Sequence, residues 1–267
     1  MLTFGYTTRR LISSLQAIST ILFFFTVLGQ PRAGAQDHDM PAGHEGMDMP
    51  MDHTMQHAMP ENIHEPTAAE LLSYKRESEF NHHLAGFLVV LAGIFLLTQN
   101  YLAKRWPNVA YAWPACFLLA GFFLLVFSDT ELWPFGPQSW LYGLRQHAEV
   151  RQHKIYALIL LGVGVVEGLR TSGRLKSAWA AWVFPVLAAA GSILLLFHQH
   201  SGGMHGADHM ERMARIQSEH LSYAITGLGI GLTKALSEMP VNWRSVFSRI
   251  WPTLMILLGV LLMFYRE

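Results

Sequence analysis

Six apolar stretches occupy most of the chain after residue 81, and this pattern constrains the fold more than any other feature. A transmembrane helix needs roughly 20 predominantly apolar residues, so each stretch is long enough, or nearly so, to cross a lipid bilayer. The third and fifth stretches are the short ones, and their glycines favour close packing of helices in lipid. We therefore expect an all-α membrane protein with six transmembrane helices, at 82–98, 110–127, 155–169, 178–197, 221–236 and 250–265.

The composition supports this expectation. Only 14% of the residues are charged and 51% are hydrophobic, and the charges gather between the apolar stretches. The net charge is zero and there is no basic domain, so nucleic acid is not an expected partner. The single cysteine, Cys116, lies in an apolar stretch and has no intramolecular disulfide partner. Any binding of a soft metal would therefore depend on methionine and histidine.

The first 35 residues have the features of a secretory signal peptide. Arg9 and Arg10 precede an apolar stretch at 11–28, and the small residues 33–35 follow it. Cleavage after Ala35 is the expected processing step, and an uncleaved anchor is the alternative. In both cases the arginines stay in the cytoplasm and residue 36 onward emerges on the outer side of the membrane.

Residues 36–66 show no apolar periodicity and are expected to be disordered. Methionine and histidine recur among Asp, Glu, Gly and Pro, whereas a plain acidic linker would not contain repeated methionine. Thioether sulfur suits Cu(I), and imidazole accepts Cu(I), Cu(II) and zinc, so the segment indicates copper binding. Its candidate ligands are His38, Met40, His44, Met47, Met49, Met51, His53, Met55, His57, Met59 and His64.

The connections between the apolar stretches predict the orientation. Basic residues are concentrated after the first, third and fifth stretches, which places these connections in the cytoplasm. Both ends of the mature chain then lie outside. All 14 histidines fall on the outer side or at the outer ends of helices. The basic residues are Lys104, Arg105, Arg170, Arg174, Lys176, Lys234, Arg244 and Arg249.

Aligning the chain on His82, His153 and His220 predicts three copies of a two-helix hairpin, at about 67–129, 138–200 and 206–267. A polar residue precedes each histidine, and small residues, a glycine and an aromatic-proline pair follow at constant spacing. Beyond the second helix of each copy comes Asp129, His200 or Glu267. The shared positions are Asn81, Gln152 and Glu219; Gly86, Ala157 and Ala224; Gly93, Gly164 and Gly231; and Trp113-Pro114, Phe184-Pro185 and Trp251-Pro252.

This alignment predicts that the three hairpins have the same orientation in the membrane. They would be related to one another by rotation about an axis along the membrane normal. We expect each proline in the first turn of its returning helix and each preceding aromatic residue at the membrane interface. Each copy then contributes one imidazole and one Asp, His or Glu to the outer ends of the helices, which we call the outer rim. The three pairs are able to converge on one site. Amphipathic stretches at 67–83, 138–153 and 207–220 either lie on the membrane surface or extend the helices outward, and they bring His147 and His209 near the rim.

The segment between the fourth and fifth apolar stretches is also rich in histidine and methionine, including the pair His198 and His200. Because His82 and His83 point about 100° apart on a helix, only one of them is expected to face the axis. For any single histidine, a structural hydrogen bond at a helix end is the alternative to a metal ligand. The candidate rim ligands are His82, His83, His153, His198, His200, Met204, His205, His209, Met210 and His220, with Asp129 and Glu267 as supporting or alternate ligands.

Other polar and sulfur-bearing residues in the apolar stretches are expected to be structural. Glu167 and Lys234 occupy equivalent positions near the cytoplasmic end and are expected to pair across copies. Cys116 and Met255 are expected in the core. Polar residues do not step through the middle of the stretches, so the sequence indicates no continuous ion pathway.

The membrane region resembles the bacterial copper-resistance protein D family over residues 81–267. The resemblance rests on four short motifs: Asn81-His82-His83, Gln152-His153, Glu219-His220 and His198-Gln199-His200. It implies copper handling at the periplasmic face of the bacterial inner membrane, with a periplasmic copper-binding partner in some members. The chain departs from the family by having six mature helices in three copies and its own Met/His segment.

We therefore expect a copper-handling integral membrane protein that is not an enzyme, which captures Cu(I) or Cu(II) on the outer side and holds it at the rim. A b-type cytochrome is an alternative, because paired histidines on facing helices bind haem b. The position of the histidines at helix ends and the methionine-rich segment argue against it. A further alternative is an assembly factor that delivers copper to a membrane copper enzyme.

Overall fold

The computed structural model describes residues 67–197 and 207–266, and these residues form helices with no β-strand. The predicted signal peptide and Met/His segment lie outside the described residues, as do His198, His200, Met204, His205 and Glu267. His209 and Met210 belong to a helix, but their side chains are also outside the described part. The helices are α2 (Ala68–Leu102), the 3-10 helix η1 (Pro107–Tyr111), α3 (Ala112–Val126), α4 (Trp140–Gln146), α5 (Ala148–Thr171), α6 (Ala180–Leu195), α7 (Ala207–Glu238) and α8 (Arg244–Met263).

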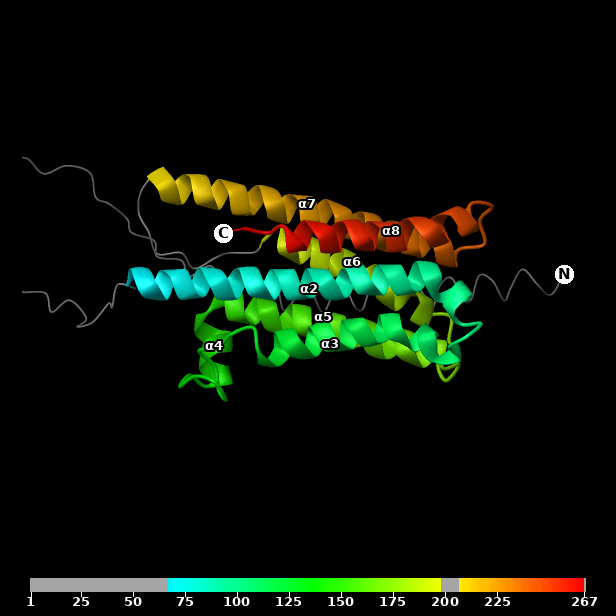
Figure 1. Ribbon diagram of the computed structural model, residues 1–267, viewed down its shortest axis with the longest axis horizontal. Helices are drawn as coiled ribbons and strands as arrows, with labels where there is room; N and C mark the ends of the chain where they lie inside the picture. Colours follow the sequence, from blue (N-terminus) through cyan, green and yellow to red (C-terminus); the bar gives the residue numbers. More distant parts are fainter. Residues whose placement is uncertain (1–66, 198–206, 267) are drawn as a thin grey trace, which may run out of the picture.

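In the described part of the chain, six long helices form a closed ring. Each packs against its neighbour in the chain, from α2 to α3, α5, α6, α7 and α8, and α8 closes the ring against α2. The most extensive contacts are α2 with α8, α3 with α5, and α6 with α7, so each predicted hairpin packs mainly on the next one. Figure 1 shows the starts of α2, α5 and α7 at one end of the ring.

Glycines allow the ring helices to approach closely, as the sequence predicted. A β-carbon on Gly86 of α2 would lie 2.6 Å from the carbonyl oxygen of Gly259 on α8, and the reverse distance is also 2.6 Å. Between α6 and α7, a β-carbon on Gly231 would lie 3.0 Å from the carbonyl oxygen of Pro185. At these crossings only hydrogen fits between the two backbones.

The aromatic residue before each proline faces the interior of the ring and not the surrounding lipid or water, which the sequence analysis did not expect. Trp113, Phe184 and Trp251 are buried and contact one another inside the ring, with ring centroids 5.4–6.4 Å apart. We call these three residues the aromatic triangle. Burial of their large apolar surface in the core outweighs any preference of tryptophan for the interface.

The proline expectation is correct only for Pro114, which lies in the first turn of α3. Pro185 and Pro252 lie inside α6 and α8, because those helices begin upstream of the prolines, at Ala180 and Arg244.

The three amphipathic stretches differ in structure. Those before His82 and His220 continue into the long helices α2 and α7, whereas the stretch before His153 contains the separate short helix α4, whose N-terminus is capped by Ser139.

Within residues 67–197 and 207–266, three helical segments are long and apolar enough to cross a membrane: Leu71–Leu102, Pro107–Val126 and Arg244–Met263. The shorter helix Ala180–Leu195 is also apolar. Many exposed side chains on the ring are large and apolar, including Phe87, Leu119, Leu158 and Leu232. Such a surface suits contact with lipid, because helices satisfy their backbone hydrogen bonds internally.

Candidate functional site

Three histidines line one cavity inside the ring. His82 comes from α2, His153 from α5 and His220 from α7, the three residues on which the hairpins were aligned. The cavity has a volume of about 260 Å³, and its walls are largely apolar. We call it the axial cavity, and the end of the ring that holds the three histidines the histidine end. The other polar residues of its lining are Asn81, Tyr156, Ser192 and Tyr223.

The hydrogen bond of His82 defines its tautomer. Its Nδ1 atom lies 2.8 Å from the carbonyl oxygen of Ser78, one turn earlier on α2. A carbonyl only accepts hydrogen bonds, so Nδ1 donates, and the lone pair of the neutral ring lies on Nε2. The imidazole stacks on the buried ring of Tyr265 at 3.9 Å between centroids, and its centroid is 6.4 Å from that of His220.

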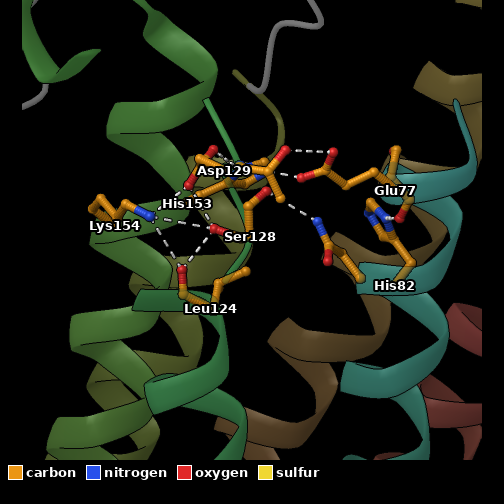
Figure 2. Close-up of polar contacts among 10 residues, drawn as sticks. Glu77, His82, Leu124, Ser128, Asp129, His153 and Lys154 are labelled. Carbon is orange, nitrogen blue, oxygen red and sulfur yellow. Dashed lines mark hydrogen bonds and ion pairs between the residues drawn. The ribbon is translucent and has the colours of Figure 1, made fainter. Parts of the chain in front are cut away.

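His153 is held by a carboxylate from the preceding hairpin. Its Nδ1 atom lies 2.8 Å from Oδ1 of Asp129, just beyond the end of α3. The other carboxylate oxygen accepts hydrogen bonds from Lys154 Nζ at 2.6 Å and from Ser128 Oγ at 2.5 Å. Figure 2 shows Asp129 between Ser128, just after α3, and Lys154 of α5. As with His82, a neutral His153 ring donating through Nδ1 carries its lone pair on Nε2.

The surroundings of Asp129 keep it ionised. Burial by itself would raise the pKa of Asp129, but the hydrogen bond and charge of His153, followed by hydrogen bonds from Lys154 and Ser128, outweigh burial and lower it below its ordinary value. The buried Lys154 ammonium also lies 5.3 Å from the ring centroid of Trp140 in α4. The carboxylate is therefore a fixed hydrogen-bond acceptor for His153.

Further polar contacts tie α2 to the same place. Thr130, next to Asp129, donates its backbone N–H and its hydroxyl to the carboxylate of Glu77, at 3.2 and 2.9 Å (Figure 2). Glu77 lies about one turn before His82 on α2, so the loop after α3 is anchored to both α2 and α5. This loop fixes the relative positions of His82 and His153.

The residue before each histidine binds the end of its own hairpin, a role that the sequence analysis missed. Asn81 donates to the carbonyl oxygen of Ser128 at 3.1 Å, and Gln152 donates to that of Phe197 at 3.0 Å. At the third position, Glu219 accepts from the backbone N–H of Arg266. The signal was present as a polar side chain at the same spacing in all three copies.

His83 faces away from the axial cavity. Its Nε2 atom lies 3.1 Å from the carbonyl oxygen of Tyr265, to which it donates, so His83 holds the end of α8 against α2. Only His82 of this adjacent pair lines the cavity, as the helical geometry predicted. Within the two described ranges, no group of three His, Cys, Asp or Glu side chains lies close enough together to hold a metal ion as it stands.

The opposite end of the ring contains a network of charged residues. The guanidinium of Arg170 on α5 donates to Glu167 at 2.8 Å and to Glu238 of α7 at 3.0 Å, and Lys234 donates to Glu238. The expected relation between Glu167 and Lys234 is therefore indirect and runs through Arg170 and Glu238. These four residues line a second cavity of about 540 Å³. We call it the charged cavity, and this end of the ring the charged end.

Comparisons of the chain with protein-family models, with curated proteins and with solved structures gave no match. The functional argument therefore depends on the residues and geometry described above.

Proposed function

We propose that this chain is a copper-handling integral membrane protein, which binds copper through His82, His153 and His220 and passes it on without chemical turnover. The observation that carries the proposal is the position of these histidines, one from each of three helices, in the lining of a single cavity. Neutral imidazole is a common ligand of copper, and three imidazoles from separate helices provide a site whose geometry is fixed by the ring.

The hydrogen bonds of the histidines support this proposal. Histidines that bind metals usually donate their second ring N–H to a carboxylate or a backbone carbonyl, which fixes the ring and makes the ligating nitrogen more basic. His153 has such a bond to Asp129, and His82 has one to the Ser78 carbonyl. In this proposal Asp129 supports a ligand, and His83, which binds the end of α8, is not a ligand.

The Met/His segment at 36–66 supports copper as the metal. Its methionines suit Cu(I), and a tethered segment presents captured ions to the cavity at a high effective concentration. We infer that the 198–206 segment, with His198, His200, Met204 and His205, contributes further ligands near the histidine end. Glu267, at the position equivalent to Asp129, is inferred to support a histidine in the same way.

We further propose that all six ring helices cross the bacterial inner membrane, as three hairpin copies, with the histidine end on the periplasmic side. The basic residues Lys104, Arg174 and Arg249 support this orientation, because they follow the ends of α2 and α5 or lie near the start of α8, away from the histidines, and positive charge favours the cytoplasm. A cleaved signal peptide would bring the mature N-terminus to the periplasm. A periplasmic copper-binding protein, as in some members of the copper-resistance protein D family, or a copper enzyme would then be the protein partner.

The test is to measure copper per protein for three purified chains: wild type, the His153→Ala/His220→Ala double variant, and a chain lacking residues 36–66. The double variant should lose the tight copper site and keep the weaker sites of the segment, whereas the deletion should do the reverse. Size-exclusion and circular dichroism profiles matching those of wild type establish that the variants are folded. Unchanged tight binding in the double variant contradicts the proposal, and a Soret band in wild type would support haem binding instead.

A further inference from the structure

We propose that the ring encloses a closed route through the membrane for a soft monovalent cation, Cu(I), and that the aromatic triangle is its gate. The route leads from the three histidines through the axial cavity to the charged cavity. The identity of the cargo rests on the proposed function, whereas the route itself rests on the two cavities and the layer between them.

The two cavities follow one another along the axis of the ring. All six ring helices contribute to the lining of both. On α5, for example, the lining of the axial cavity runs from His153 to Val163, and that of the charged cavity begins at Glu167. On α7 the axial cavity ends at Ile230 and the charged cavity begins at Lys234. The axial cavity therefore lies inside the ring, and the charged cavity is an open depression at the charged end, beyond the axial cavity along the same helices.

The layer between the cavities is about one helical turn thick. On both α5 and α7, the last residue that lines the axial cavity and the first that lines the charged cavity are four positions apart. This separation corresponds to roughly 6 Å at 1.5 Å per residue. The aromatic triangle fills this layer, because Phe184 lines the axial cavity while Trp113 and Trp251 line the charged cavity. Three rings in contact are thus the main barrier between the two cavities, and a hydrophobic constriction of this kind closes a pathway to hydrated ions.

A sulfur ligand is available on the histidine side of the gate. Met255 lines the axial cavity, one turn after Trp251 on α8. Cys116, three residues after Trp113 on α3, belongs to the same buried cluster as the triangle but lines neither cavity, so Met255 is the sulfur side chain that an ion in the axial cavity meets. Thioether and thiol sulfur bind Cu(I) well and bind hard cations poorly. A Cu(I) ion leaving the histidines therefore meets a thioether ligand that replaces water before the ion reaches the aromatic rings.

The other face of the gate already holds a cation. The Lys234 ammonium lies 4.9 Å from the ring centroid of Trp251, a favourable cation-π distance. Glu238 accepts a hydrogen bond from the same ammonium, and Glu167 lies beyond Arg170. An arriving Cu(I) ion takes the place of Lys234 on Trp251, and the ammonium swings away from the ring while it stays bound to Glu238. This exchange keeps the number of positive charges at the aromatic face constant.

The test is to measure Cu(I) flux into liposomes that contain the full chain and an enclosed Cu(I)-sensitive dye. Wild type should take up Cu(I) faster than empty liposomes. Met255→Leu removes the sulfur with little change in volume, so its flux should fall several-fold, whereas Met239→Leu changes an exposed methionine and should have no effect. Phe184→Ala and the milder Phe184→Leu thin the gate and should raise the flux, while Trp179→Ala, at an exposed tryptophan, should not.

Three outcomes separate the claims. Flux through wild type equal to that of empty liposomes, with the histidine site still binding copper, overturns the route and leaves the proposed function intact. Absence of copper binding by wild type in detergent overturns the proposed function, and with it the cargo. Normal flux through Met255→Leu, or unchanged flux through both Phe184 variants when they elute as folded protein, overturns the assignment of the gate.

Discussion

His153 on α5 is bonded through Nδ1 to Asp129, which lies 24 positions earlier, at the end of the preceding hairpin, at a distance of 2.8 Å. The same carboxylate binds Lys154, so one acidic residue fixes both side chains at the start of α5. The end of one hairpin thereby orients the histidine of the next. Under the proposed function, this contact links the packing of the ring to the geometry of the metal site.

Asp129→Asn should weaken copper binding without removing the site. The amide cannot supply the negative charge that supports His153, and loss of such a supporting group typically costs roughly 10–100-fold in metal affinity. Competition with a chelator of known affinity measures the change. The same affinity in Asp129→Asn and wild type would show that the carboxylate does not support a ligand.

The lowered pKa of Asp129 predicts loss of stability in acid. A carboxyl group with a folded pKa below its unfolded value, about 3.9 for aspartate, stabilises the fold above the unfolded pKa and loses that contribution as the pH falls through the folded pKa. The thermal midpoint of wild type in detergent should therefore fall more steeply than that of Asp129→Asn below about pH 4. Parallel curves for the two proteins would contradict this role of Asp129.

Gly259→Ala should destabilise the closure of the ring. Its β-carbon would lie 2.6 Å from the Gly86 carbonyl oxygen, so α8 and α2 would have to move apart, and overpacking of this kind typically costs about 1–3 kcal/mol. Gly162→Ala is the matched control, since its nearest neighbour would be Leu187 at an ordinary 3.5 Å. Thermal unfolding of the two variants should show a lower midpoint only for Gly259→Ala. Equal midpoints would mean that the α2 and α8 backbones are not in close contact.

Arg170→Ala should destabilise the charged end, because it leaves the carboxylates of Glu167 and Glu238 without their shared partner. Removing one member of a buried ion pair costs about 3–5 kcal/mol, and the partial exposure of Arg170 reduces this to about 1–3 kcal/mol. Arg174→Ala, at an exposed position in the following turn, serves as the control. The second change Glu167→Gln should restore part of the loss in thermal midpoint. If Arg170→Ala unfolds like Arg174→Ala, the network contributes nothing measurable.

Some of this arrangement could be predicted from the sequence because it depends on local spacing. Constant spacing aligned His82, His153 and His220, and the structure puts all three in one cavity lining. Because successive residues of a helix point about 100° apart, only one of His82 and His83 was expected to face the ring axis, and this is correct. Core positions for Cys116 and Met255 were also predicted correctly, from their apolar surroundings.

Other contacts depend on how the ring closes, which spacing does not reveal. The stacking of Tyr265 on His82 joins residues from opposite ends of the described chain, and it exists because α8 packs on α2. The aromatic triangle was assigned to the membrane interface, because its residues are typical of that location when each hairpin is considered alone. In the sequence, Arg170 counted only as one of the basic residues that predict a cytoplasmic connection. Its position between Glu167 and Glu238 depends on the meeting of α5 and α7 at the charged end.

The central claim is that the histidines lining the axial cavity hold copper, and the adjacent pair His82 and His83 tests it most directly. Copper affinity of the full chain is measured by chelator competition in wild type, His82→Ala and His83→Ala. Our account predicts that His82→Ala weakens the tightest site by more than the roughly 10–100-fold expected for a lost supporting group, and that His83→Ala leaves it unchanged. Equal effects of the two substitutions, or no effect of His82→Ala, would contradict it.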